Sequence, residues 1–196
     1  EAETGASVQI NTNMMVVSTD AEGKVVAAIL DVAQQKVAFD MDGVAGEVDL
    51  RTKVEKEGDY GMKGVSAIGK EYFEQAKAYT EWMTGKTVAE VLEMPTYERD
   101  ASHTACPDVE ELKASCTITV GDYLKALQEA YDTAVECATV PVKTGYGVEI
   151  TATVKGEDAE AETGASVQIN TNMMVVSTDA EGKVAAAILD VAQQKV

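Results

Sequence analysis

The chain has 196 residues, of which 16 are basic and 34 acidic, so its formal net charge is −18. Such an acidic protein is a poor partner for duplex nucleic acid, because contacts to phosphate need a basic face. Hydrophobic residues make up 45% of the chain, which is enough for a buried core. No apolar run approaches the ~20 residues that span a bilayer. Composition therefore predicts a globular protein with no transmembrane segment, whose acidity favours solubility through mutual repulsion.

An internal repeat is the most informative feature of the sequence. Residues 1–37 return as residues 160–196 with a single change, from Val26 to Ala185. We therefore expect the chain to be one unit of a longer tandem array, a processed fragment or a polymer subunit. Neighbouring copies of the same repeat are the expected partners, because near-identical units meet through the same interface.

The repeated segment has the pattern of β-strands. Residues 7–18 alternate between polar and apolar side chains and are rich in β-branched residues, which predicts a strand. Asp20 to Gly23 forms a turn, after which residues 24–39 are expected to pair back as a second and a third strand. Residues 40–66, rich in glycine and charge, are predicted to be irregular.

Two amphipathic helices are predicted in the middle of the chain. Residues 68–83 carry one apolar stripe at helical spacing, formed by Tyr72, Ala76, Tyr79 and Met83. Thr87 and Glu90 form a capping box that opens a short helix. The second long helix is expected at residues 122–137, with Leu124, Leu127, Tyr131 and Val135 facing inward.

Strands are predicted on both sides of this second long helix. Residues 115–120 form an apolar, strand-like run, and residues 143–155 alternate as residues 7–18 do. Residues 156–162, GEDAEAE, form an acidic link to the repeated segment. Cys116 and Cys137 are both expected to be buried as small hydrophobic residues.

These elements predict an α+β fold, in which an antiparallel sheet carries two main helices and the unit is repeated in tandem. Residues 1–139 would form a domain that lacks its own first strand. Residues 140–196 would be a linker followed by the first strand and hairpin of the next repeat. The first sheet would then have an open edge, for which the equivalent strand of a neighbouring copy is the expected partner by strand addition.

Three stretches carry a resemblance to a known family: residues 20–43, residues 56–91 and residues 145–155. They resemble the FMN-binding-domain-like repeats of secreted and lipid-anchored proteins of anaerobic Gram-positive bacteria. In the founding members of that family, the flavin-carrying subunits of sodium-pumping and Rnf-type redox complexes, FMN is attached through its phosphate to a threonine. The attachment motif there is Ser/Thr-Gly-Ala-Thr at the start of a helix. The resemblance implies an extracellular or cell-surface protein with FMN as a candidate cofactor.

The corresponding stretch in this chain precedes the first long helix, at residues 64–70. It has no threonine where the ester would form, so covalently attached flavin is not expected. Ser66, Gly69 and Lys70 are the residues that the resemblance offers for a flavin phosphate, because a helix N-terminus favours an anion. The similar string at residues 4–7, Thr-Gly-Ala-Ser, opens a strand and not a helix.

Other chemical motifs are incomplete. Cys106, Cys116 and Cys137 are an odd number of thiols, so at least one is unpaired within the unit, and a disulfide from Cys106 is an open alternative. These thiols and His103 lack the spacing of a zinc site. Residues 40–43, Asp-Met-Asp-Gly, contain part of a calcium loop but are interpreted as a turn. No catalytic residue and no metal site is predicted.

Two functions follow as expectations. The first is a structural repeat of an extracellular or cell-surface fibre or stalk, which assembles by repeat-to-repeat or strand-addition contacts and needs no cofactor. The alternative is an extracellular FMN-binding electron-transfer flavoprotein. Enzymatic activity is not the expectation, because no constellation of catalytic side chains is visible.

Overall fold

The computed structural model describes residues 5–155 and 165–196. These residues form strands β1 (Ser7–Thr19), β2 (Val25–Ala38), β3 (Thr96–Tyr97), β4 (Cys106–Pro107), β5 (Lys143–Lys155), β6 (Ser166–Thr178) and β7 (Val184–Lys195). They also form helices α1 (Tyr72–Met83), α2 (Val88–Leu92) and α3 (Gly121–Asp132), with 3₁₀ turns η1 (Glu57–Tyr60) and η2 (Glu110–Leu112).

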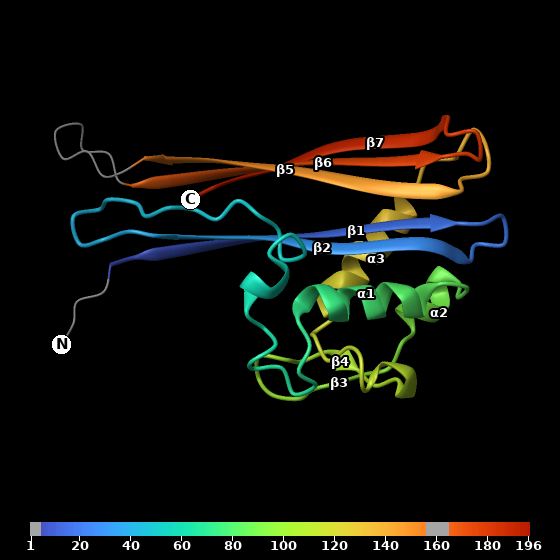
Figure 1. Cartoon of the computed structure of the whole chain (residues 1–196), viewed down its shortest axis with the longest axis horizontal. Coiled ribbons are helices and arrows are strands. Elements are labelled where there is room, and N and C mark those ends of the chain that lie inside the picture. The colour runs from blue at the N-terminus through green and yellow to red at the C-terminus, as the bar shows by residue number, and fades with distance from the viewer. Residues whose placement is uncertain (1–4, 156–164) are drawn as a thin grey trace.

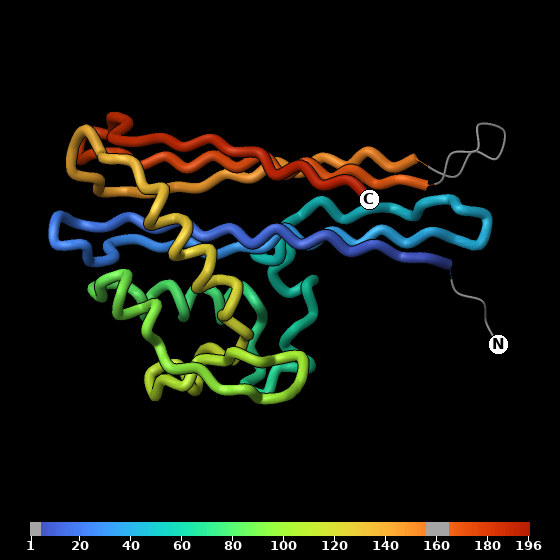
Figure 2. Tube along the Cα trace, turned by 180° about the vertical axis from the view of Figure 1, so that it is seen from behind, coloured from blue at the N-terminus to red at the C-terminus, as the bar shows by residue number. Residues whose placement is uncertain are grey.

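The molecule is built in layers. β1 and β2 form a two-stranded antiparallel sheet, and β5, β6 and β7 form a three-stranded one in that order. The two sheets lie face to face, and the helices lie on the other side of β1–β2 (Figure 1). Seen from behind, α3 crosses beside β1 before the chain rises to the three-stranded sheet (Figure 2). β3 and β4 form a short ribbon at the far side of the helices.

Alternation along β1 divides its side chains between two cores. Ile10 and Met14 face the three-stranded sheet, while Met15 and Val17 face the helices. The core between the sheets is made of eight buried residues from both of them and the following loop: Ile10, Met14, Ala33, Val37, Phe39, Ile150, Val167 and Ile169. The repeated hairpins therefore meet through equivalent faces, since Ile10 and Ile169 hold the same place in the repeat.

The second core lies between the β1–β2 sheet and the helices. α1 packs against β2 and α3 against β1. The predicted apolar stripe of α1 is confirmed, because Tyr72, Ala76, Tyr79 and Met83 are all buried in this core. Leu127 of α3 is fully buried beside them.

The predicted fold class is wrong. The strands do not form one antiparallel sheet that carries two main helices and repeats in tandem; they form separate sheets in a mostly β protein. The physical reason is that β1 and β5 do not pair edge to edge. Instead the three-stranded sheet stacks on the β1–β2 hairpin through an apolar face that includes Ile150 of β5 and Ile169 of β6.

Two strand predictions need correction. Residues 24–39 contain one strand, β2 (Val25–Ala38), and not two, because the next turn comes only at residues 40–43. Residues 115–120 form no strand, since their backbone groups bond elsewhere: Thr117 N–H donates to the side chain of Gln75 (2.8 Å) and Val120 N–H to the carbonyl of Ala105 (2.8 Å). The strands predicted at residues 7–18 and 143–155 are confirmed.

The predicted helix at residues 122–137 is too long. α3 ends at Asp132, and the Thr133 hydroxyl donates to the carbonyl of Glu129 (2.8 Å) at its C-terminus. Val135 lies beyond the helix and is exposed, and Tyr131, in its last turn, is exposed as well and not inward. Cys116 is buried as expected, whereas Cys137 lies in the exposed segment beyond the helix.

The predicted turn and the predicted capping box are both present in the structure. The turn at Asp20–Gly23 is confirmed, with Gly23 at a φ of 77° that favours glycine. The capping box of Thr87 and Glu90 opens α2 as expected. The acidic link at residues 156–162 lies outside the described residues, as does Thr4. Within the described ranges, no helix is both long and apolar enough to cross a membrane.

Candidate functional site

The two copies of the repeated hairpin differ in their strand pairing. β6 is paired on both sides, with β5 along Lys143–Lys155 and with β7. β1 has the same sequence as β6 but pairs only with β2. Among the described residues, one edge of β1 therefore has no strand partner, and unpaired edges are templates for strand addition.

The alternation of backbone hydrogen bonds shows which residues of β1 direct their N–H and C=O groups toward the unpaired edge. Val167 of β6 and Val196 exchange two backbone hydrogen bonds of 2.8 and 2.9 Å. Since backbone groups alternate in direction along an antiparallel strand, the residues next to Val167 in β6 direct theirs toward β5. In β1 the equivalent residues are Gln9, Asn11 and Asn13. Their backbone groups point to the free edge, and their side chains are exposed.

Asparagine side chains support the pairing of β5 with β6. Asn172 Nδ2 donates to the carbonyl of Glu149 (3.0 Å), and Asn170 Nδ2 donates to the hydroxyl of Thr151 (3.3 Å). Asn11 and Asn13 hold the same positions in β1. The edge of β1 thus offers the same backbone and side-chain donors that β5 uses on β6.

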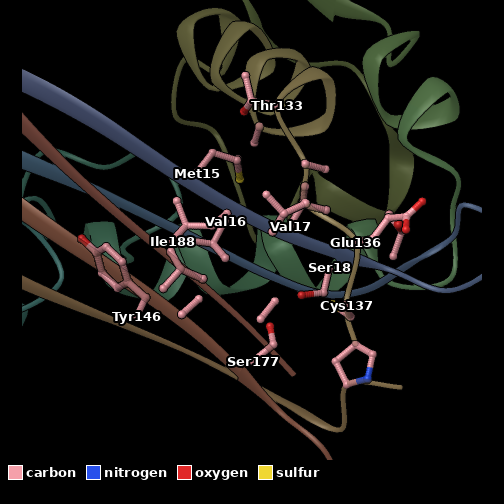
Figure 3. Close-up of a pocket in the computed structure, with 18 of the residues that line it drawn as sticks. Met15, Val16, Val17, Ser18, Thr133, Glu136, Cys137, Tyr146, Ser177 and Ile188 are labelled. Carbon is pink, nitrogen blue, oxygen red and sulfur yellow. The ribbon is translucent and has the colours of Figure 1, made fainter. Parts of the chain in front are cut away.

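A groove of about 1050 Å³ runs along the second half of this edge. β1 forms one wall, the chain after α3 closes one side, and β6 and β7 contribute the opposite wall (Figure 3). Its lining is mainly apolar, with Val16 facing Ile188 across the groove, and Ser18 and Ser177 at its polar end. Sequence reasoning missed this groove because it combines segments far apart in the chain.

The loop before α1 places Ser66, Gly69 and Lys70 close together, but in structural roles. The Ser66 hydroxyl accepts a hydrogen bond from Nε2 of the buried Gln75 (3.1 Å). Gly69 adopts a φ of 63° and donates its N–H to the carbonyl of Ser66 (3.0 Å). The Lys70 carbonyl accepts from the same Gln75 amide (3.1 Å).

Carboxylates already occupy the start of α1. Glu71 is the N-cap residue and is buried, and its Oε2 accepts from the N–H of Met62 (2.8 Å). Glu74 Oε2 accepts from the N–H of Glu71 (2.8 Å), which completes a capping box. Two negative charges at this helix start disfavour a phosphate there. The spacing of Glu71 and Glu74 was the sequence signal for this arrangement.

A buried carboxylate links the two sheets. Asp31 of β2 accepts a hydrogen bond from the N–H of Val54 (3.1 Å), and the hydroxyl of Tyr146 from β5 donates to its other oxygen (3.4 Å). Burial raises the pKa of the Asp31 carboxyl above its usual value and also raises the pKa of the Tyr146 phenol. The pair couples the two sheets, and its Tyr146 also lines the groove.

The remaining candidates form no reactive centre. His103 Nδ1 lies 2.7 Å from Asp100 Oδ1 in an exposed turn, and this contact lowers the pKa of Asp100. Residues 40–43 form the predicted turn, in which Asp40 Oδ1 accepts from the N–H of Val44 (2.8 Å). All three cysteines are free. Within residues 5–155 and 165–196, no three His, Cys, Asp or Glu side chains gather as metal ligands would.

Comparison with known proteins gives one partial match. No family model matches the chain, and no solved structure matches it. A chlorophenol reductase of Desulfitobacterium hafniense is 44% identical over 54 residues, which make up 28% of this chain. The matched stretch spans only 16% of the reductase. A similarity of this extent does not place the chain in a family.

Proposed function

We propose that this chain is a structural module of an extracellular or cell-surface fibre or stalk, which joins a neighbouring copy by accepting a strand at the free edge of β1. The observation that carries the proposal is internal to the molecule. The sequence of β1 recurs as β6, and β6 takes β5 in an unbroken register of 13 residue pairs. A strand with the sequence of β5, supplied by a neighbouring copy, therefore fits the first half of β1, around Gln9, Asn11 and Asn13, by the same pairing.

This proposal sets the unit boundary near residue 140. Residues 1–139 would accept the strand, and residues 140–196 would supply a linker, a strand and a hairpin that belong to the next unit. The connection after α3 supports that division, because Ala138 N–H donates to the carbonyl of Ala185 (2.9 Å) and Val142 N–H to that of Thr178 (2.7 Å). These bonds tie the segment to the second hairpin and not to the first.

The competing function is an extracellular FMN-binding electron-transfer protein. The partial similarity to a reductase does not separate the two functions, because it covers so little of that protein. The visible absorption spectrum of the purified protein separates them. A structural module is colourless, whereas a flavin band that survives purification would overturn the structural proposal.

Strand addition is tested with a chain that carries its own donor strand. Residues 143–159 are joined ahead of Glu1, which reproduces the connection that precedes Glu160. We expect the amides of Gln9 and Asn13 to exchange with deuterium at least about tenfold more slowly than in the original chain, because paired amides exchange only when the pair opens.

Asn11→Pro is the matched control. It removes a backbone donor from the free edge without breaking a bond to β2, which an edge strand tolerates. In the extended chain this substitution should return exchange at Gln9 and Asn13 to the rate of the original chain. Unchanged exchange in the extended chain, or protection that survives Asn11→Pro, would contradict strand addition at β1.

A further inference from the structure

The outer face of the second hairpin is bare although its sequence is that of a buried face. Val184 is 62% exposed where its counterpart Val25 is 1% exposed. Leu189 is 67% exposed against 3% for Leu30. A contiguous apolar face of this kind marks an interaction surface.

Val191 extends the same face. It is 47% exposed, whereas its counterpart Val32 is 1% exposed, and Met174 of β6 lies on the same side and is also exposed. In the first hairpin the equivalent residues all contact the helices. We define the bare face as the surface formed by Met174, Val184, Leu189 and Val191.

The first hairpin shows what covers such a face. α1 packs on β2 and α3 on β1, and the buried core between them includes Tyr79 and Leu127. Polar contacts add to this packing. The backbone of Val25 bonds to Gly85 and Lys86 (2.8 Å each), and the carbonyl of Val32 accepts from Lys53 N–H (2.9 Å).

The one substitution between the copies does not alter this surface. Val26, which Ala185 replaces, is 46% exposed in the first hairpin and lies outside the helix-packed core. Every residue of the bare face is identical to its counterpart in or against the helix-packed core. The shape and hydrogen-bonding groups that bind the helices on β1–β2 are therefore repeated on β6–β7.

The geometry points to one occupant: we infer that the bare face binds a second copy of the helical segment, residues 38–140, joined to β7 as the first copy is joined to β2. The helices of this chain are committed to β1–β2, so the second copy comes from outside residues 1–196. This contact goes beyond strand addition at β1, because it uses a face of β6–β7 and no backbone edge of β1.

The test is a chain in which residues 38–140 follow Val196, at the junction that Val37 makes with Ala38. We expect the amides of β7 to exchange at least about tenfold more slowly than in the original chain, because the docked helices keep the strand closed. Binding of the dye ANS should fall at the same time, since the bare face is then covered.

Leu189→Asp is the matched variant. Leu189 is exposed in the original chain, so we expect the substitution to leave the fold of that chain intact. The circular dichroism spectrum of the variant checks this. In the extended chain a buried, unpaired carboxylate opposes docking, and the protection of β7 should be lost. Equal exchange of β7 in the original and extended chains, or protection that Leu189→Asp leaves intact, would overturn the inference. Asn11→Pro should leave this protection unchanged, so failure of strand addition and failure of helix docking are separate outcomes.

Discussion

Asp31 shows how one residue type takes different roles in two copies of one sequence. In β2 it is buried and hydrogen-bonded to Val54 and Tyr146, and in β7 its counterpart Asp190 is exposed. Burial disfavours the charged carboxylate, which raises the pKa of Asp31 above the usual 3.8. A group whose pKa is raised by folding binds protons more tightly in the folded state. The free energy of unfolding therefore falls as pH rises from 3.8 through the raised pKa.

Asp31→Asn should remove this pH dependence. The amide oxygen still accepts from Val54 N–H, while the cost of a buried charge is lost, so we expect the free energy of unfolding at pH 7 to rise. Urea unfolding between pH 4 and pH 7 measures the effect. Asp190→Asn, in the same local sequence, should change it by less than about 0.5 kcal/mol. A loss of stability at pH 7 in Asp31→Asn would show that the charge itself is stabilising.

At the scale of single elements, the start of α1 depends on Glu71. Its carboxylate accepts the N–H of Met62 in a buried position, so its removal leaves that donor without an acceptor. Glu71→Ala should lower the free energy of unfolding by about 1–2 kcal/mol. Glu81→Ala is the control, because Glu81 lies exposed in the same helix and pairs only with Lys77 (3.7 Å); its effect should stay within about 0.5 kcal/mol. Equal losses in the two variants would remove the capping role.

Elements were predictable from sequence where local chemistry decides them. Alternation placed the strands at residues 7–18 and 143–155, and the apolar stripe placed α1. The strand predicted at residues 115–120 was wrong because backbone groups of this run form hydrogen bonds with distant residues, such as the side chain of Gln75, and not with a neighbouring strand. The end of α3 was missed because the apolar spacing of Leu124, Leu127, Tyr131 and Val135 continues past Asp132, where the helix ends.

The arrangement of the whole molecule was beyond local patterns. The two hairpins have nearly the same sequence, so no local pattern could predict that helices cover one of them and leave the other exposed. The open edge was inferred from the offset of the repeat, but the free donors at Gln9, Asn11 and Asn13 follow only from the register of the sheets. The stacking of β1–β2 on β5–β7 likewise brings together residues more than 100 positions apart, such as Asp31 and Tyr146.

Substitution of Leu30 and of Leu189 measures how the helix-covered hairpin differs from the exposed one. They have the same neighbours in sequence, but Leu30 lies in the helix-packed core and Leu189 is exposed. Leu30→Ala should cost about 2–5 kcal/mol of unfolding free energy, because it leaves a cavity in a packed core. Leu189→Ala should cost less than about 0.5 kcal/mol in the same urea titration. Once residues 38–140 follow Val196, however, Leu189→Ala should cost as much as Leu30→Ala, since both leucines then face helices. A small effect of Leu189→Ala in both chains would mean that sequence identity between the hairpins does not carry the binding of helices with it.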